Sequence, residues 1–115
     1  MAGVAALLVA KAYKLRDRAK SGRSERLSDK DAADVYRLIT TTDPRGLAET
    51  FERLLRHPRV ATVARTGLGL LHAQFGAART IGVEMAARAL EGSVPESQVR
   101  MVAPAFVAEL PHPDG

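Results

Sequence analysis

Apolar residues recur along most of the chain at the three- and four-residue spacing of an amphipathic helix. The pattern predicts helices over about 3–20, from after Ser28 to about 40, over 45–56, 60–75 and 83–90, and from after Pro95 to about 110. No segment alternates apolar and polar residues for long enough to indicate a strand. We therefore expect an all-α fold, a compact bundle of five or six helices. It would form a single domain over residues 1–110, with a disordered tail at 111–115.

Local signals mark several helix ends. Asp43 followed by Pro44 is typical of an N-cap and the first residue of a helix, here the third. Ser28 with Asp31 three residues later resembles a capping box, which would start the second helix at Ser28. Pro104 falls inside the last predicted helix and should kink or split it, because proline cannot donate the helical hydrogen bond.

Composition narrows the class of protein. The 115 residues are enough for one small domain, and only 4% are aromatic, so the core must be built mainly from Leu, Val and Ala. The absence of cysteine excludes disulfides, thiolate nucleophiles and cysteine-based zinc sites. The apolar start of the chain is shorter than the roughly 20 residues of a membrane helix and has no basic residues before it. We expect a cytoplasmic protein with no membrane partner.

The first predicted helix carries positive charge on its apolar face. Lys11 lies three residues after Leu8 and four before Leu15, on the stripe that should face the core. Lys14 and Arg18 follow at spacings of three and seven from Lys11, on the adjoining face.

The second predicted helix carries negative charge in the same way. Asp31 is four residues before Val35, and Asp34 is four residues before Leu38, so both carboxylates point toward or beside the core. Asp29 points elsewhere and suits an acid that faces the positive end of the helix dipole.

Charges that enter a helix interface unpaired would each cost several kcal/mol, so Lys11, Asp31 and Asp34 should meet each other or a ligand. In one interpretation, Lys11–Asp31 or Lys11–Asp34 ion pairs clamp two antiparallel helices. In the other, the residues form half of a site for a phosphate-bearing ligand. Lys11, Lys14 and Arg18 would then hold the phosphates, and an aspartate would orient a base, a ribose or the lysine.

The segment 11–26 concentrates the basic residues of the chain. It holds seven Lys and Arg residues against two acids, a net charge of +5, whereas the whole chain carries +4. Such a segment could bind a phosphate backbone, or it could be a solvated helix face. Tyr13 is its one aromatic residue, so it does not predict a platform on which bases stack.

Three other patterns lack the context that chemistry requires. Asp29, Lys30 and Asp31 spell Asp-x-Asp, but at the start of a helix residues two apart do not share a face, so we expect no metal site. The three histidines have no metal-ligand spacing. No strand precedes "GLGLLHAQFG", so it is not a dinucleotide loop, and Gly67 and Gly69 instead favour close helix packing.

The stretch "ALLVAKAYKLRDR…RLSDKDAADVYRLI" resembles the helical hairpin of abortive-infection, AbiEii-type nucleotidyltransferase-like proteins. In that family an apolar helix with a lysine precedes a basic loop, a K/R-D-x-x-D motif and a second apolar helix. The matching residues here are Lys11, Lys30, Asp31, Asp34 and Leu38, within about residues 5–40.

The resemblance implies that Lys11 contacts nucleotide phosphates and that Asp31 or Asp34 completes an active site. Family members carry magnesium on an α/β palm with a Gly-Ser sequence followed by Asp-x-Asp. This chain has neither the strands of a palm nor that combined motif, since no acidic pair follows Gly92-Ser93. The chain would thus be the nucleotide-facing C-terminal helical half of a toxin-type protein, a truncated gene product, or a descendant that lost transfer activity. A nucleoside triphosphate and magnesium would meet in a palm outside it, and a palm-domain chain or a cognate antitoxin would be its partner.

Two interpretations remain beside the resemblance. The chain could be a non-enzymatic helical module that binds a protein or RNA through the basic segment 11–26, or a structural remnant without a ligand. RNA binding should weaken steeply with salt, whereas a nucleotide site should depend specifically on Lys11.

Overall fold

The described part of the chain folds into six helices. The computed structural model describes residues 3–21 and 25–113, and side chains over 3–18 and 28–113. The helices are α1 (Gly3–Ser21), α2 (Glu25–Thr40), α3 (Pro44–Arg56), α4 (Ala61–Phe75), α5 (Ile81–Ala89) and α6 (Glu96–Ala108). No strand occurs in these ranges, so the all-α prediction is confirmed. Across the same residues, no helix has the length and apolar character that crossing a bilayer requires.

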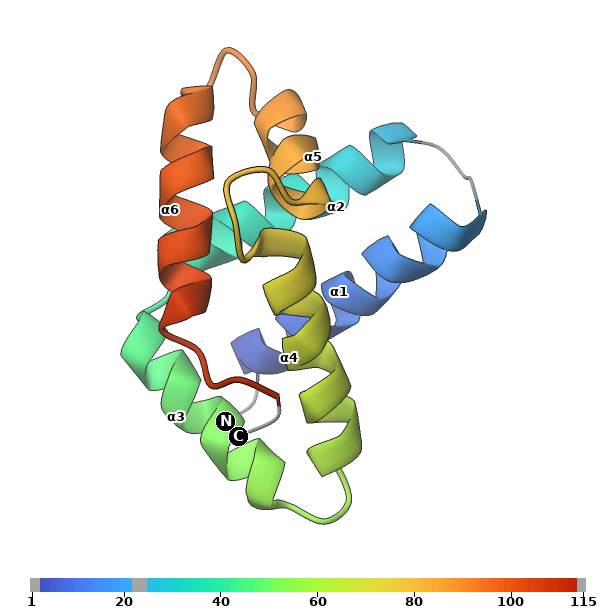
Figure 1. The fold of residues 1–115 in the computed structure, drawn as a ribbon, viewed down its shortest axis with the longest axis vertical. Helices are drawn as coiled ribbons and strands as arrows, with labels where there is room; N and C mark the ends of the chain where they lie inside the picture. The colour runs from blue at the N-terminus through green and yellow to red at the C-terminus, as the bar shows by residue number, and fades with distance from the viewer. Residues whose placement is uncertain (1–2, 22–24, 114–115) are drawn as a thin grey trace.

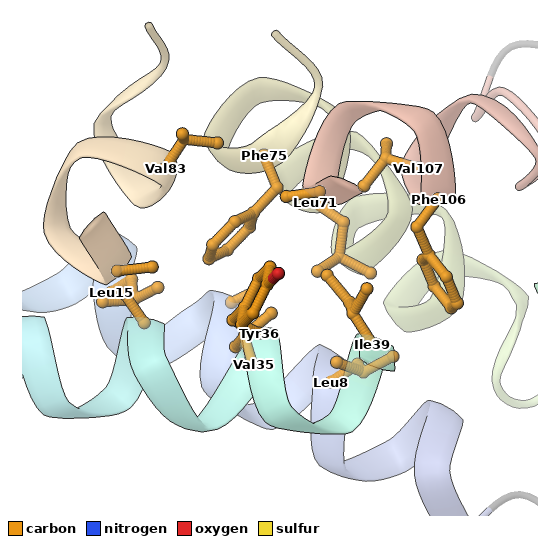
Figure 2. Packing of buried hydrophobic residues seen from close by; sticks show 14 of the residues in the cluster. Leu8, Leu15, Val35, Tyr36, Ile39, Leu71, Phe75, Val83, Phe106 and Val107 are labelled. Carbon is orange, nitrogen blue, oxygen red and sulfur yellow. The ribbon is translucent and has the colours of Figure 1, made fainter. Parts of the chain in front are cut away.

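The helices enclose one core. Figure 1 shows α2 running back in roughly the opposite direction to α1, with α5 lying beside α2 and α4 crossing near α1. α3 and α6 pack on the same assembly, and the radius of gyration is 13.3 Å, the value of a compact domain of this length. In Figure 2 the apolar side chains of α1, α2, α4, α5 and α6 converge. The labelled residues are Leu8, Leu15, Val35, Tyr36, Ile39, Leu71, Phe75, Val83, Phe106 and Val107.

The helix ends confirm one capping prediction and correct another. Asp43 is the N-cap of α3, and its carboxylate accepts a hydrogen bond from the Gly46 amide at 3.0 Å. Ser28 is not an N-cap, because α2 begins one turn earlier, at Glu25. The sequence Glu-Arg-Leu before Ser28 contains good helix formers, and these extend the helix toward the N-terminus. The capping box with Asp31 is therefore wrong.

The start of α5 and the continuity of α6 also differ from what the sequence pattern predicts. α5 begins at Ile81, two residues before the expected start, and α6 runs without a break through Pro104. Figure 1 likewise draws α6 as one continuous helix. Pro104 therefore does not split α6, since a single missing hydrogen bond is tolerated inside a helix that packs against its neighbours.

The segment 111–113 packs against α4. The His72 Nε2 donates a hydrogen bond to the Pro111 carbonyl at 3.0 Å, and the rings of His72 and His112 stack with centroids 4.7 Å apart. Sequence alone placed these residues in a disordered tail, and the remainder of that tail, 114–115, lies outside the described residues.

A glycine permits the closest approach of α1 and α4. A Cβ added to Gly67 would lie 2.7 Å from a Val9 methyl group, well inside van der Waals contact. Gly69 has more room, because its added Cβ would meet only Pro113 at 3.7 Å. Close helix packing is thus confirmed at Gly67.

Candidate functional site

Lys11 of α1 lies between two carboxylates of α2, those of Asp31 and Asp34. Its Nζ donates to the Asp31 Oδ1 at 2.8 Å and to the Asp34 Oδ2 at 3.1 Å, so both ion pairs expected from the helical period are present. The Lys11 side chain retains 22% of its exposure, while Asp31 retains only 8%. The lysine thus sits at the solvent edge of the seam between α1 and α2, and Asp31 lies beneath it.

Two arginines engage the remaining carboxylate oxygens. Arg18 donates to the Asp31 Oδ2, and Arg37 donates to the Asp34 Oδ1 at 3.1 Å. Each of the four carboxylate oxygens therefore accepts a hydrogen bond from a cation. We call Lys11, Arg18, Asp31, Asp34 and Arg37 the carboxylate network. Arg37 was missed by sequence reasoning, although its spacing of three from Asp34 on one helix is a signal for such a pair.

The network fixes the ionisation of its central residues. Burial alone would raise the pKa of Asp31, but the hydrogen bond and charge of Lys11, with the charges of Arg18 and Lys14, hold that pKa below its ordinary value. The hydrogen bond to Asp31, followed by that to Asp34, raises the pKa of Lys11 against the opposing effect of burial. Asp31 is therefore a carboxylate at neutral pH and a poor acceptor for a proton in catalysis.

Lys14 stands apart from the hydrogen bonds of the network. It is exposed, and among the described residues it has no hydrogen bond or ion pair, although its charge helps to lower the pKa of Asp31. The structure therefore places Lys11 and Arg18 in ion pairs with Asp31, and Lys14 is close enough for its charge to lower the pKa of Asp31. Counting Lys14 and Arg37, four cations surround two carboxylates, which leaves a local surplus of positive charge.

Asp29 has a different role from the one expected. It lies at the fifth position of α2 rather than facing the helix end, and its carboxylate accepts two hydrogen bonds from Arg88 of α5, at 2.9 and 3.1 Å. This bidentate pair ties α2 to α5. The two carboxylates of the Asp-x-Asp sequence therefore contact different helices. Asp29 pairs with Arg88 of α5, whereas Asp31 pairs with Lys11 and Arg18 of α1.

The network does not fit a magnesium ion. Mg²⁺ is usually bound by carboxylate oxygens that are available to it, and all four oxygens of Asp31 and Asp34 already accept from cations. The described ranges 3–21 and 25–113 also contain no cluster of three or more His, Asp or Glu residues that could hold a metal.

The basic segment 11–26 is described only in part, because the side chains of 19–27 lie outside the described residues. Within the described part, the guanidinium of Arg16 lies over the ring of Tyr13, 4.7 Å from its centroid, and Arg16 also pairs with Asp17 at 3.1 Å. This Tyr13 face is thus occupied by a cation of the same helix.

Comparisons with protein-family models, curated proteins and solved structures find no match to this chain. The resemblance to nucleotidyltransferase-like proteins rests on the residues of the hairpin alone.

Proposed function

We propose that this chain is a nucleotide-facing helical module that binds phosphate groups through Lys11, Lys14 and Arg18. The observation that carries the proposal is the position of Lys11, held by Asp31 and Asp34 at the edge of the α1–α2 seam with part of its side chain in solvent. Arg18 is held by the carboxylate of Asp31, and the exposed Lys14 adds its positive charge near that carboxylate.

The donors of this face suit an oxyanion. An ammonium group has three N–H donors, and the carboxylates engage two of those of Lys11, which leaves one for a ligand. The surplus of cations favours a group that brings negative charge, such as a triphosphate. In this proposal Asp31 and Asp34 position Lys11 and Arg18, and they do not exchange protons with a substrate.

The resemblance of residues 5–40 to the nucleotidyltransferase-like hairpin suggests that the phosphate-bearing ligand is a nucleoside triphosphate. In a nucleotidyltransferase-like assembly, the helical half would neutralise the charge of a nucleoside triphosphate while a palm outside this chain carried the magnesium and the chemistry. Within the described residues no group fits the metal, so in this proposal the contribution of the chain is electrostatic. A palm-domain chain or an antitoxin would then be the protein partner.

Calorimetric titration with ATP, CTP, GTP and UTP at low salt tests this proposal. Lys14→Ala should weaken nucleotide binding about three- to tenfold, since an exposed cation close to a phosphate contributes about 1 kcal/mol. Lys11→Ala should abolish binding while circular dichroism shows the helices retained. Arg59→Ala, which removes an exposed charge from the α3–α4 connection, is the matched control and should bind as the wild type does.

Failure of all four nucleotides to bind the wild type would overturn the proposal. Equal losses in Lys14→Ala and Arg59→Ala would do the same, because they would indicate general charge attraction. If a single-stranded RNA binds instead, with affinity that falls steeply as salt rises, the basic segment 11–26 is the better account.

A further inference from the structure

A groove lies away from the α1–α2 seam. It has a volume of about 640 Å³, within the size range of small-molecule sites. One wall is the C-terminal half of α3, another is the start of α4, and the third is the segment 111–113. The lining residues are Glu52, Leu55, Arg56, Arg65, Pro111, His112 and Pro113.

Two arginines of this groove have no partner within the part of the chain that the structure describes. Neither Arg56 nor Arg65 has a hydrogen-bond or ion-pair partner among the described residues, and both side chains are exposed. Glu52 lines the same groove, but within the described residues no ion pair joins it to Arg56 or Arg65. Arginines elsewhere in the molecule, such as Arg18 and Arg88, hold carboxylates of neighbouring helices. The two groove arginines are thus available to a ligand from solution.

The third wall is held in place by contacts outside the groove. The carbonyl of Pro111 accepts from the His72 Nε2, and the ring of His72 stacks on His112. Pro113 lies along α4 at Gly69. Pro111 and Pro113 line the groove together with Leu55, so the lining combines apolar surface with two cationic groups.

We propose that this groove binds a small organic oxyanion, a phosphate or carboxylate carried on an apolar body. Arg56 and Arg65 would bind the oxyanion, because planar guanidinium groups match its oxygens in a bidentate manner. Leu55, Pro111 and Pro113 would contact the apolar body. Glu52 in the same groove disfavours a ligand with negative charge along its whole length. The site is independent of the carboxylate network and of the nucleotide proposal.

The test is an NMR titration of the ¹⁵N-labelled full chain with four probes: phenyl phosphate, benzoate, inorganic phosphate and benzyl alcohol. We expect saturable shifts of the Arg56, Arg65 and His112 amides with phenyl phosphate or benzoate, and much weaker binding of the other two. Arg65→Gln should lower the affinity at least tenfold. Arg45→Gln removes another exposed charge, at the start of α3 and outside this lining, and should leave the affinity unchanged.

Any of three results would overturn the inference: no saturable shift with either aromatic anion, equal affinity for benzyl alcohol, or the same loss in Arg45→Gln as in Arg65→Gln. Equal affinity for inorganic phosphate would overturn the apolar part of the site. Leu55→Ala provides a second check, since it should weaken phenyl phosphate while leaving the weak binding of inorganic phosphate unchanged. All three substituted side chains lie at least partly in solvent, so the fold should tolerate the changes.

Discussion

Lys11 of α1 and Asp31 of α2, twenty positions apart in the chain, meet with 2.8 Å between the Nζ and Oδ1 atoms. The contact joins a cation to a carboxylate at the point where a helical hairpin would ordinarily bury hydrocarbon. Asp34 and Arg18 extend it, so that one network links the two helices and presents cations at its solvent side. Its contribution to stability and its capacity to bind phosphate are separable by experiment.

Replacement of Asp31 should destabilise the fold. Asp31→Asn would leave Lys11 and Arg18 at the interface without their shared carboxylate, and we expect a loss of about 1–3 kcal/mol in the free energy of unfolding. Urea denaturation measures this loss, provided that the m-value is the same for wild type and variant. Asp17→Asn is the control, because among the described residues the exposed Asp17 pairs only with its neighbour Arg16, and its loss should change stability by less than about 0.5 kcal/mol. Equal urea midpoints for the wild type and Asp31→Asn would mean that the network does not stabilise the fold.

The stabilisation from Asp31 should depend on pH in the acid range. Because folding lowers the pKa of Asp31, its contribution is fully present above the ordinary aspartate value of about 3.9 and is lost as pH falls through the folded value. The difference in urea midpoint between wild type and Asp31→Asn should therefore be constant from about pH 5 to 8 and shrink below about pH 4. A difference that persists undiminished at pH 2 would contradict this assignment.

The close approach of α1 and α4 makes Gly67 sensitive to any side chain. Gly67→Ala would place a methyl group about 2.7 Å from Val9, and we expect a net destabilisation of about 1–2 kcal/mol, since overpacking outweighs the gain in helix propensity. Gly69→Ala, two residues along the same helix, should instead stabilise by up to about 1 kcal/mol. Thermal unfolding of both variants measures the contrast. In a Val9→Ala background the Gly67→Ala penalty should disappear, and its persistence there would place the clash elsewhere.

The buried amide of Gln74 is only half satisfied. Its Nε2 donates to the Ala12 carbonyl at 2.9 Å, while its Oε1 has no partner among the described residues. Ala12 lies inside α1, where its carbonyl also serves the helical hydrogen bond. Gln74→Met removes the unsatisfied oxygen and fills similar space, so the free energy of unfolding should be unchanged or increase by up to about 1 kcal/mol. A decrease beyond about 1.5 kcal/mol would show that the bond to Ala12 holds α1 against α4.

The helical period was sufficient to predict the centre of the network. Lys11, Asp31 and Asp34 stand where the repeat requires apolar residues, and opposite charges on two adjacent helices have few arrangements other than pairing. Asp43 was predictable for a similar local reason, because a capping side chain acts within one turn.

Features that depend on distant residues were not predictable from local pattern. The partner of Asp29 is Arg88, 59 positions away, and nothing near Asp29 specifies it. The segment 111–113 has the composition of a frayed end, yet His72, 39 residues before Pro111, fixes it against α4. The groove that this segment forms with Arg56 and Arg65 could be found only from the tertiary arrangement. Residues that are far apart in the chain thus create the sites that sequence reasoning missed.

A double-mutant cycle between Lys11 and Asp31 tests the network most directly. Lys11→Met, Asp31→Asn and the double variant are compared with wild type by urea denaturation at pH 7, and the sum of the single losses is compared with the double loss. If Lys11 is held by Asp31 as the 2.8 Å contact indicates, the coupling energy should be about 1 kcal/mol or more. A coupling energy indistinguishable from zero would mean that the two helices do not depend on this pair, and that Lys11 is not fixed in the position from which it would bind phosphate.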